Sequence, residues 1–524
     1  MKNQLSRTSL RLLAPALFTA LVATAHAATH PMVFISDTQY AWTEKTDSGE
    51  PESEADKRSR SRNFIMRQAD ATRTYREANG GLDKVPLFLN GDVTAFGHGD
   101  ERDFMYGRPF ATYEKNFYWL LGNHDYQNNV NDCANNGCAR DMVHDLRGTV
   151  ERKYPFRFFD DNQQDGGWTR YTGSLAYSMQ FGQLLALQLH NEPTYTTRFD
   201  SNRSTISITT SLDFLEKELQ WARLAGKDVI LNMHKGPYTN WKAAAGSADR
   251  NRFIELMKAN EDIILGIFAG HLHRQSGLRS MVGTIPVYLS GASQYGTFLT
   301  AVYDDQTRTL RVSRVTGNDW KGSSTEVGVS TARPTRAAAR PDIRDYPRHG
   351  WGTWGNIAMC PDGEAISAFV LRSEAPRSSG DNSGVNAVRF RCGKGGTSVT
   401  RELSSKEGPW GEWGKWQYCS SFITGLQHRI EPPQGSGDDT AASNLRFKCA
   451  DGAVLEGDAP GEWGNWAGLH TCPAGTVAAG FWSKVEDPHQ GDNSALNRIQ
   501  IFCRAEPEHA RVQAIEDGSA IGPQ

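Results

Sequence analysis

The chain has 524 residues, a formal net charge of −3 and 22% charged residues, a share typical of globular proteins. This length exceeds what one hydrophobic core normally serves, so two or more domains are expected. The small net charge does not indicate a nucleic-acid-binding protein on charge alone.

Residues 1–27 predict a secretory signal peptide, which makes the protein secreted or periplasmic. Lys2, Arg7 and Arg11 form a basic end, LLAPALFTALVAT is an apolar core, and residues 25–27 are a small-x-small cleavage site. The apolar core is shorter than the roughly 20 residues that span a bilayer, so cleavage is favoured over an uncleaved anchor. No later stretch of the sequence is expected to cross a membrane.

The cysteines indicate disulfide bonds. All of them lie after the signal segment, and an even number in an exported chain favours disulfides over zinc ligands. The first two would close a short loop, and the last six fall into three pairs spaced by 32, 30 and 31 residues. Spacing suggests this pairing, but six cysteines allow many connectivities. The cysteines are Cys133, Cys138, Cys360, Cys392, Cys419, Cys449, Cys472 and Cys503.

The exported part divides into two domains and a linker. Residues 28–321 alternate strand-like apolar runs with helical patterns such as 211–226, which predicts an α/β domain. Residues 322–346 show no apolar periodicity and contain prolines, so we assign them to a linker. Residues 347–506 form the second domain, and the polar stretch 507–524 is a tail expected to fray.

The second domain is an internal repeat of three units. In each unit two tryptophans precede a cysteine by nine and six residues, and a Gly-Asp pair places its aspartate eleven residues before the next cysteine. Short alternating pieces such as AVRFRC, NLRFKC and IQIFC predict strands. The tryptophans are Trp351, Trp354, Trp410, Trp413, Trp463 and Trp466; the pairs are Gly380-Asp381, Gly437-Asp438 and Gly491-Asp492; Asn386, Asn444 and Asn497 follow them, the second offset by one.

Five short motifs occur in a fixed order in the first domain, and each follows an apolar run that predicts a strand. Side chains at the carboxyl ends of strands can converge above one edge of a sheet. Metal-type ligands in this arrangement are what a two-metal hydrolase needs. The motifs are Asp37-Thr38-Gln39, Asn90-Gly91-Asp92, Gly122-Asn123-His124-Asp125, Asn232-Met233-His234 and Gly270-His271-Leu272-His273.

These motifs offer both metal ligands and a proton donor. Asp92 can bridge two cations, because a carboxylate has two oxygens and several lone pairs. His234, His271 and His273 offer imidazoles, and the Asn123 amide offers an oxygen. His124 is suited to protonate a leaving alkoxide, and Asp125 is expected to hold the His124 ring and raise its basicity.

In combination, GNHD and GHLH make residues 30–315 resemble the calcineurin-like metallophosphoesterase family. The resemblance implies a sandwich of two sheets flanked by helices, with a centre of two divalent metal ions for which Mn, Zn and Fe are the open choices. It also implies His124 as the acid. The implied ligands are Asp37, Asp92 and His273 for one ion, and Asp92, Asn123, His234 and His271 for the other.

Two positions depart from patterns within that family. The first motif is usually Asp-x-His, and Gln39 takes the place of the histidine; an amide oxygen is a harder and weaker ligand than imidazole. We interpret Gln39 as a ligand or close neighbour of the first metal, with a simple spacing residue as the alternative. Ala95 stands where purple acid phosphatases place a tyrosine, which argues against a coloured ferric site.

The second domain resembles the vitelline membrane outer layer protein family in its paired tryptophans, Cys-Pro-x-Gly turns and Gly-Asp-x-[Ser/Thr] turns, although Cys419 is followed by Ser420 instead of proline. The resemblance implies a threefold β-prism with one Greek-key sheet per repeat. Similarity in shape to β-prism lectins suggests a glycan or cell-surface ligand. We interpret the tryptophans as packing around the pseudo-threefold axis, in preference to stacking on sugar rings.

The leading hypothesis is an exported, metal-dependent phosphoesterase that carries a β-prism for surface or glycan targeting. The alternative is a non-catalytic secreted glycan-binding protein with a degenerate metal site. Among the remaining residues, His98 and His190 are candidates to line the cleft and Lys235 to meet substrate phosphate, each with a purely structural or solvated alternative. His144 is expected to carry no chemistry. Substrate and oligomeric state are not specified by the sequence.

Overall fold

The structure is a computed structural model. It describes residues 29–164, 167–239, 247–333, 352–376, 382–395, 398–432, 440–488 and 494–507, together with the backbone of 340–343. The predicted signal segment, Trp351, the three Gly-Asp pairs and residues 508–524 of the predicted tail lie outside the described residues.

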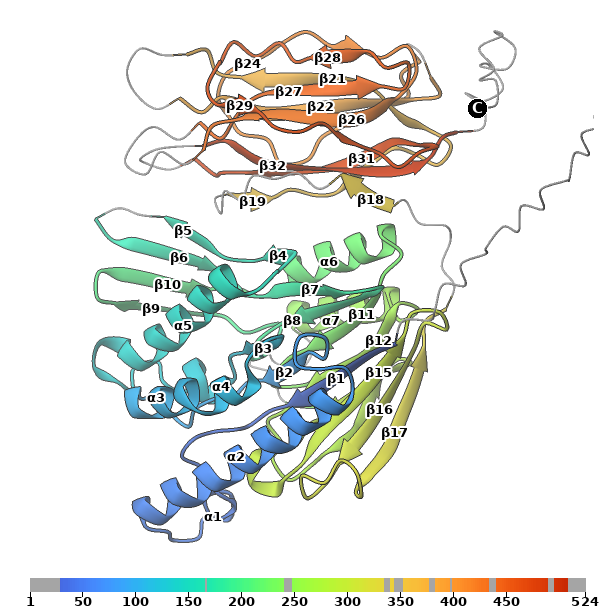
Figure 1. Cartoon of the computed structure of the whole chain (residues 1–524). Coiled ribbons are helices and arrows are strands. Elements are labelled where there is room, and N and C mark those ends of the chain that lie inside the picture. The colour runs from blue at the N-terminus through green and yellow to red at the C-terminus, as the bar shows by residue number, and fades with distance from the viewer. Residues whose placement is uncertain are drawn as a thin grey trace, which may run out of the picture.

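The first domain is built on two stacked sheets whose facing sides share one apolar core (Figure 1). Phe34 of one sheet stacks on Phe268 of the other, with 3.7 Å between ring centroids. In the first sheet three neighbouring strands run parallel, β1 (Thr29–Ile35), β2 (Leu87–Asn90) and β3 (Phe117–Leu120). Its other strands are β15 (Phe298–Asp304), β16 (Thr309–Val315) and β17 (Ser324–Thr331), in the order β17-β16-β15-β1-β2-β3.

The second sheet has the order β13-β14-β12-β11-β8-β7-β4, and its central strands are also parallel. They are almost fully buried and read as continuous apolar runs, as expected for parallel strands covered on both faces. Its strands are β4 (Phe158–Phe159), β7 (Tyr177–Phe181), β8 (Leu184–Gln188), β11 (Asp228–Asn232), β12 (Ile264–Ala269), β13 (Gly277–Val282) and β14 (Ile285–Leu289).

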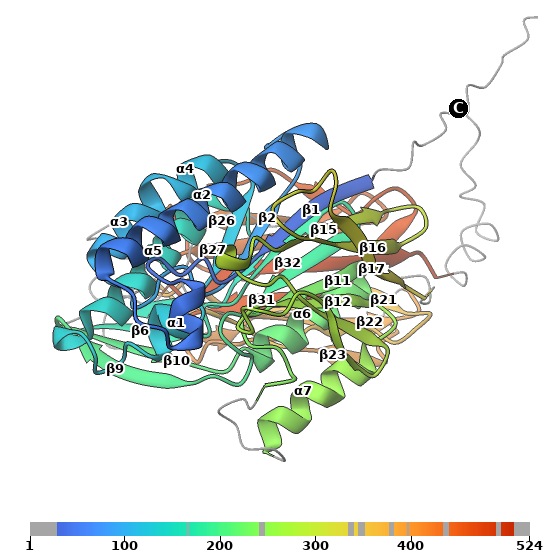
Figure 2. The ribbon, with the colours of Figure 1, turned by 90° about the horizontal axis from the view of Figure 1, so that it is seen from below.

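Helices cover the outer faces of the two sheets. Figure 2 shows the strands between α2, α3 and α4 on one side and α6 and α7 on the other. The amphipathic pattern at 211–226 is confirmed as a helix, α6, whose Leu212, Leu215, Leu219 and Trp221 are buried. The helices are α1 (Glu44–Ser48), α2 (Glu54–Ala78), α3 (Gly99–Gly107), α4 (Pro109–Tyr113), α5 (Gly137–Lys153), α6 (Leu212–Leu224) and α7 (Ala248–Ala259).

A small third sheet stands beside these layers. Its strands are β5 (Asn162–Gln164), β6 (Thr169–Gly173), β10 (Ser204–Ile208) and β9 (Thr197–Ser201), in that order. Short helical turns complete the domain at η1 (Asn123–Gln127), η2 (Ala134–Asn136) and η3 (Ser293–Tyr295).

The predicted linker begins too early. Residues 324–331 form β17, an antiparallel edge strand that pairs with β16. Its side chains are mostly exposed or half-buried, so the strand lacks the apolar alternation by which the sequence would reveal it. A cut near Ser323 would remove this strand from the sheet.

The second domain consists of three antiparallel sheets around one apolar core, which is a β-prism as the fold class predicted. Phe369, Phe390, Phe447 and Phe481 meet there, with ring centroids 4.4–5.2 Å apart. Each sheet has a long hairpin: β21 (Ala365–Ser373) with β22 (Val385–Gly393), β26 (Ile423–Ile430) with β27 (Ala442–Cys449), and β31 (Thr476–Val485) with β32 (Leu496–Ala505).

Short strands of a neighbouring repeat close each sheet, so the repeats are interlocked. The first hairpin pairs with β24 (Glu412–Trp413) and β25 (Gln417–Tyr418), and the second with β29 (Asn465–Trp466) and β30 (His470–Thr471). The third pairs with β19 (Thr353–Trp354) and β20 (Ala358–Met359) of the first repeat. The remaining strands are β18 (Arg340–Ile343), β23 (Arg401–Leu403) and β28 (Val454–Glu456).

The same kind of polar contact recurs within each of the three repeats. A glutamate at the end of each first hairpin strand accepts a hydrogen bond from a hydroxyl of the returning strand: Glu374 from Ser383, Glu431 from Thr440 and Glu486 from Ser494. Asn386 also donates a hydrogen bond to Ser383, and Asn497 donates one to Ser494. The offset Asn444 instead donates to Glu456 at 3.1 Å, so the irregular spacing corresponds to a different contact.

The disulfide pairing suggested by spacing is confirmed. Cys360 is bonded to Cys392, Cys419 to Cys449 and Cys472 to Cys503, and Cys133 to Cys138 in the first domain. The three bonds of the prism domain each close a loop of about 30 residues, for which the chain-entropy model gives a stabilisation of roughly 3–4 kcal/mol.

The interpretation that the paired tryptophans pack around the pseudo-threefold axis is wrong for the described ones. The axis is filled by phenylalanine and aliphatic side chains. Trp413 and Trp466 lie half-buried on the sheets, with the guanidinium groups of Arg389 and Arg446 over their rings at 4.4 and 3.9 Å. A sugar ring could stack on these faces only by displacing the arginines.

The prism domain packs directly against the first domain through its third sheet. Trp482 is fully buried, lies 4.3 Å from Trp354 and contacts Phe158 of β4, with 5.9 Å between ring centroids. Lys217 of α6 donates a hydrogen bond to the Trp354 carbonyl oxygen at 2.7 Å. The two domains are therefore joined by an apolar contact as well as by the chain.

Only the third repeat carries a large aromatic residue at the strand position that Trp482 occupies. The strand registers place Trp482 in correspondence with Val370 and Gln427 of the other repeats. The Trp482 indole donates to the Gly355 carbonyl oxygen, and the Gln427 amide donates to the corresponding Ala467 carbonyl oxygen. Either glutamine or tryptophan can therefore make this hydrogen bond within the prism. The tryptophan ring at 482 in addition packs against Phe158 of the first domain.

We expect Trp482→Gln to weaken the coupling of the two domains. Glutamine can keep the hydrogen bond but loses the buried ring, so the free energy of unfolding should fall by about 3 kcal/mol. In calorimetry we expect the wild-type protein to unfold in one transition and the variant in two. Trp168→Ala, which removes a ring that is 52% exposed, is the control and should leave unfolding unchanged. An unchanged transition in Trp482→Gln would contradict the coupling.

Candidate metal centre

The five motifs all lie just beyond the carboxyl ends of parallel strands. Asp37 follows β1, Asp92 follows β2, and Asn123 follows β3 of the first sheet. His234 follows β11, and His271 and His273 follow β12 of the second sheet. Because the two sheets are stacked, the five loops meet at one end of the sandwich.

At this end two groups of possible metal ligands share one carboxylate. Asp37, Asp92 and His273 form one group, and Asp92, His234 and His271 form the other. Within each group the ligand atoms lie within 4.8 Å of one another. Asp92 therefore occupies the position of a bridge between two neighbouring sites.

Asp92 is completely buried and surrounded by donors. Its Oδ2 lies 2.9 Å from Gln39 Nε2 and 3.0 Å from His234 Nε2, and its Oδ1 accepts the His124 backbone N–H at 2.9 Å. Burial alone would raise the pKa of this carboxyl, but the His234 and His124 imidazoles outweigh it and hold the pKa below its usual range. The group is thus kept as a carboxylate, the form that binds a cation.

The second group is oriented by the backbone. His234 Nδ1 lies 3.0 Å from the Asn90 carbonyl oxygen, which leaves Nε2 facing Asp92. The Asn123 amide oxygen lies 3.1 Å from the same Nε2, so this predicted ligand also belongs to the cluster. The His271 ring lies 5.2 Å from the His234 ring, and burial together with the His234 charge lowers the pKa of His271 to about 4. A neutral imidazole is what a metal requires.

The first group is centred on Asp37, whose carboxylate accepts the His271 backbone N–H at 3.0 and 3.1 Å. His273 Nε2 lies 3.4 Å from Asp37 Oδ1. Burial would lower the pKa of His273, but Asp37 and Asp47 on either side of the ring raise it to about 10. The two carboxylates thus make the surroundings of this ring attractive to positive charge.

Two motif glycines are required by the close approach of the loops. A Cβ on Gly122 would lie 2.1 Å from Asp92 Oδ1, and one on Gly270 would lie 2.6 Å from Asp37 Oδ2. Any larger residue would push a ligand carboxylate out of place. The glycines of GNHD and GHLH thus belong to the site even though they offer no ligand.

Gln39 points into the cluster. It is completely buried, its amide nitrogen donates to Asp92, and its Oε1 has no hydrogen-bond partner within the described part of the chain. A buried, unpartnered oxygen beside two candidate ligand groups is a position that a cation would satisfy. The clustered carboxylates, imidazoles and amides therefore fit a pair of divalent ions.

Asp125 does not hold the His124 ring, so the predicted contact is wrong. Its carboxylate accepts the backbone N–H groups of Val93, Thr94 and Gly122 at 2.8–3.1 Å. Burial and the nearby Asp92 charge raise the pKa of Asp125 to about 7. Its contacts make it a positioning residue that ties the loops after β2 and β3 together.

His124 is instead held by the backbone. Its Nδ1 lies 2.8 Å from the Ala95 carbonyl oxygen, and its own N–H is bound by Asp92. The other ring nitrogen, Nε2, is left for a reacting group. This arrangement suits the predicted proton donor without any carboxylate partner.

The sequence did not reveal Asp47, which lies on α1 in the polar segment after β1. Its Oδ1 lies 2.7 Å from both His273 Nδ1 and Trp42 Nε1, and its Oδ2 accepts the Tyr295 hydroxyl at 2.8 Å. A carboxylate on the far nitrogen of a ligand histidine fixes the ring and raises its basicity. Nothing in the local sequence marks this role, because the contact spans 226 residues.

We expect Asp47→Asn to weaken metal binding at the first group by about 10–100-fold, since the ligand histidine loses its charged partner. Titration of the metal-free protein with Mn²⁺ or Zn²⁺ would measure this. Asp83→Asn, whose side chain is 69% exposed, is the matched control. Equal affinities in both variants would exclude a role for Asp47 at the centre.

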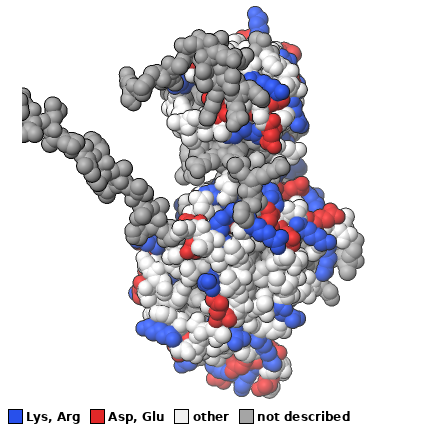
Figure 3. Space-filling view, turned by 90° about the vertical axis from the view of Figure 1, so that its right-hand side faces the viewer, with Lys and Arg blue, Asp and Glu red and all other residues white. Residues whose placement is uncertain are grey.

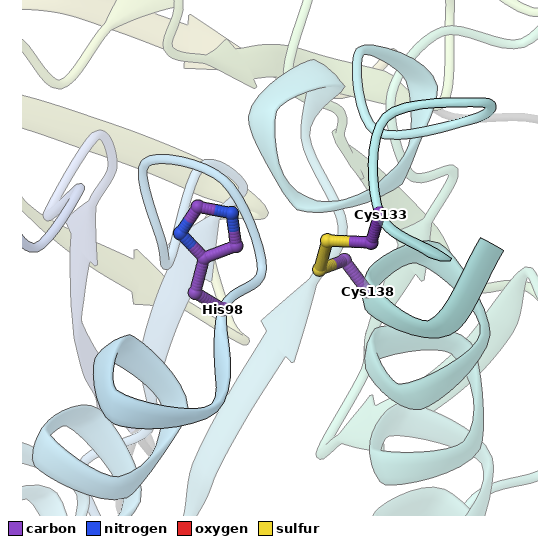
Figure 4. Close-up of side chains that lie close together, drawn as sticks. All are labelled: His98, Cys133 and Cys138. Carbon is purple, nitrogen blue, oxygen red and sulfur yellow. A yellow bond between two sulfur atoms is a disulfide. The ribbon is translucent and has the colours of Figure 1, made fainter. Parts of the chain in front are cut away.

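The other sequence candidates lie around the centre. His98 and both sulfurs of Cys133 and Cys138 come within 4.8 Å of one another, but the sulfurs are joined in a disulfide and are not thiolate ligands (Figure 4). His190 is buried beneath the third motif, where its Nδ1 accepts the Leu121 N–H at 3.1 Å, and burial lowers its pKa to about 4. It is a structural residue and does not line a cleft.

Lys235 and His144 complete the predicted set. Lys235 Nζ donates to Gln127 Oε1 at 2.8 Å, beside the third motif. His144 lies on α5, outside the candidate ligand groups, with its ring 4.8 Å from that of Tyr171.

Residues 30–275, which form most of the two-sheet sandwich, match the family described as calcineurin-like phosphoesterase. A dimetal phosphatase from Danio rerio has a similar fold; it is 13% identical, with a TM-score of 0.35, and the alignment covers 57% of this chain and 98% of that one.

Residues 343–503 match the family described as vitelline membrane outer layer protein I, as do residues 453–522. The human vitelline membrane outer layer protein 1 homolog is 38% identical over 160 residues, which are 29% of this chain and 77% of that protein. The Mus musculus homolog is 37% identical over 162 residues, or 30% and 79% of the two chains. The chain therefore belongs to the vitelline membrane outer layer protein I family through its prism domain, and the domain before it matches the calcineurin-like phosphoesterase family.

Proposed function

We propose that this protein is an exported phosphoesterase that hydrolyses a phosphomonoester or phosphodiester at a centre of two divalent metal ions. The observation that carries the proposal is the position of Asp92, which is shared by two groups of ligands at the end of the sandwich. Two ions held a few ångströms apart are suited to an in-line displacement at phosphorus.

Each ion would have its own set of ligands. Asp37, Gln39, Asp92 and His273 would hold the first, and Asp92, Asn123, His234 and His271 the second. When bound, the ions supply a nucleophile at neutral pH and neutralise charge on the phosphoryl oxygens. Mn, Zn and Fe are the choices compatible with mixed imidazole and oxygen ligands.

The chain supplies the proton for the leaving group. In the imidazolium form of His124, Nδ1–H donates to the Ala95 carbonyl oxygen and Nε2–H is directed to the leaving alkoxide. Asp125 holds the surrounding loops, so the ring keeps its place as the proton moves. His124 is therefore the proposed general acid.

The prism domain would hold the enzyme at a glycan or cell surface, which raises the local concentration of substrate. Figure 1 places α1, whose Asp47 contacts the candidate ligand His273, at the end of the first domain away from the prism. The prism is therefore proposed as a targeting module and not as a wall of the active site.

On the face shown in Figure 3, positive and negative side chains alternate without forming one large basic area.

The proposed location is secreted or periplasmic, because four disulfide bonds persist in an oxidising compartment. Among the helices that the structure describes, none is long and apolar enough to cross a membrane.

Metal analysis and a hydrolysis panel test the proposal together. The purified protein should hold two equivalents of Mn, Zn or Fe, and it should hydrolyse p-nitrophenyl phosphate, bis-p-nitrophenyl phosphate or a phospholipid. Glycan binding by a protein that holds no metal and hydrolyses none of these would favour the alternative, a glycan-binding protein with a degenerate centre.

Gln39→His should strengthen binding of a transition metal at the first group. Imidazole is a better ligand for such ions than an amide oxygen, and the Gln39 side chain already lies against Asp92. We expect an increase in affinity of about tenfold or more for Zn²⁺, measured by titration of the metal-free protein. Unchanged affinity would show that residue 39 does not face the ion.

A further inference from the structure

Three aromatic side chains form a rim beside His124. The Trp42 ring lies 5.0 Å from the His124 ring, and the Phe96 ring lies 6.2 Å from it. Trp42 and Phe96 are 6.3 Å apart, and His98 stacks on Phe96 at 5.6 Å. We call Trp42, Phe96 and His98 the aromatic rim.

The rim is held in place by buried polar groups. The Trp42 indole donates to Asp47, and the Phe96 backbone N–H donates to Glu101 at 2.8 Å. Glu101 is only 4% exposed and also accepts the His98 N–H at 3.3 Å. The rings are therefore presented by a preformed surface, which reduces the entropy lost when a ligand binds.

The outer part of the rim is open to solvent. Phe96 is 42% exposed, and the His98 side chain is 44% exposed. Figure 4 shows the His98 ring on its loop, facing the Cys133–Cys138 disulfide across a gap. Phe96 does not stand alone, because it lies against Trp42 and His98 and beside His124, so the exposed rings form one aromatic surface next to the buried centre.

The position of His124 decides which part of a substrate would meet the rim. The residue that protonates the leaving oxygen lies next to the leaving group, so the rings beyond it face the alcohol part of the ester and not the phosphoryl group. We propose that the aromatic rim binds the leaving group, and that the preferred substrates are phosphoesters whose alcohol carries a flat aromatic ring. This inference rests on the proposed phosphoesterase function.

Flat aromatic rings are favoured over other apolar groups by the geometry of the rim. Offset or edge-to-face packing of rings at 4.5–7 Å contributes about 0.5–1.5 kcal/mol beyond the area buried. A puckered ring of the same size buries similar area without that contribution. Quaternary ammonium groups also bind aromatic faces, typically inside an aromatic cage, whereas the Phe96 and His98 side chains of the rim are 42% and 44% exposed.

Binding of non-hydrolysable phosphonates separates this inference from the proposed activity. We expect the metal-loaded protein to bind benzylphosphonate about two- to tenfold more tightly than cyclohexylmethylphosphonate, measured by calorimetry. In Phe96→Leu, which keeps an apolar side chain but removes the ring, the ratio should fall towards one. Trp168→Ala removes an exposed ring elsewhere and should keep the wild-type ratio.

The same pair of alcohols, as benzyl and cyclohexylmethyl phosphate, tests turnover. A preference in kcat/KM for the benzyl ester that disappears in Phe96→Leu supports the rim. Equal binding of the two phosphonates, or tighter binding of phosphocholine than of either, overturns it even if hydrolysis is fast. Absent hydrolysis with an intact preference in binding would instead reject the proposed activity and leave the rim as a ligand site.

Discussion

Asp92→Asn should lower turnover by at least about 10³-fold while the protein stays folded. Asp92 is shared by both ligand groups, so this one substitution removes a charge from two metal sites at once. An asparagine of the same shape can keep some of the contacts with Gln39 and His124, which is why the fold should survive. The loss should therefore appear in metal content and kcat, with little change in the thermal unfolding temperature.

The control for this variant is Asp83→Asn, which removes a carboxylate of high exposure from the same domain. It should keep two metal equivalents and wild-type turnover. If Asp92→Asn kept both metal ions and near wild-type activity, the shared carboxylate would not be a bridge. The two ligand groups would then not form a pair of metal sites joined through Asp92, and the contact between Asp92 and His234 would be an ion pair beside a single metal site.

The ligand cluster was predictable because each motif follows a parallel strand. Strand ends bring distant residues to one edge whatever the intervening loops do, so Asp37, Asp92 and His234 could be placed together without knowing the loops. Asp47 could not, since its contact with His273 depends on the path of the segment after β1. That path is decided by tertiary packing and has no local pattern.

Adjacency in sequence does not correspond to contact at Asp125. It follows His124 within the helical turn η1, where successive side chains point in different directions, and its carboxylate turns towards the backbone of the second motif. Strand β17 was missed for a different reason. An exposed edge strand has no apolar face to bury, so its sequence resembles that of a linker.

The prism shows what an internal repeat can and cannot reveal. Equal cysteine spacing pointed to the disulfides that the structure contains, because each bond joins equivalent positions of one repeat. The repeated tryptophans could not be placed from the sequence, because their spacing does not indicate whether they face the axis of the prism or its surface. The residue that breaks the pattern, Trp482, is the more informative one, because it identifies the repeat that contacts the first domain.

His124→Ala should lower turnover by roughly 10²–10⁴-fold and leave the metal content unchanged. His124 belongs to neither candidate ligand group, and it touches Asp92 through its backbone N–H, which alanine retains. The loss should shrink for p-nitrophenyl phosphate, whose leaving group needs no proton, and be largest for alkyl esters. This dependence on the leaving group is a result that general damage to the site would not produce.

His144→Ala is a matched control, because it removes a histidine of the same domain that lies on α5 and outside the cluster. It should reproduce wild-type turnover on both kinds of ester. A loss of metal from His124→Ala would instead make this residue a ligand. An equal loss on alkyl and nitrophenyl esters would mean that His124 stabilises charge on the phosphoryl group, since a proton donor acts only where the leaving oxygen requires a proton.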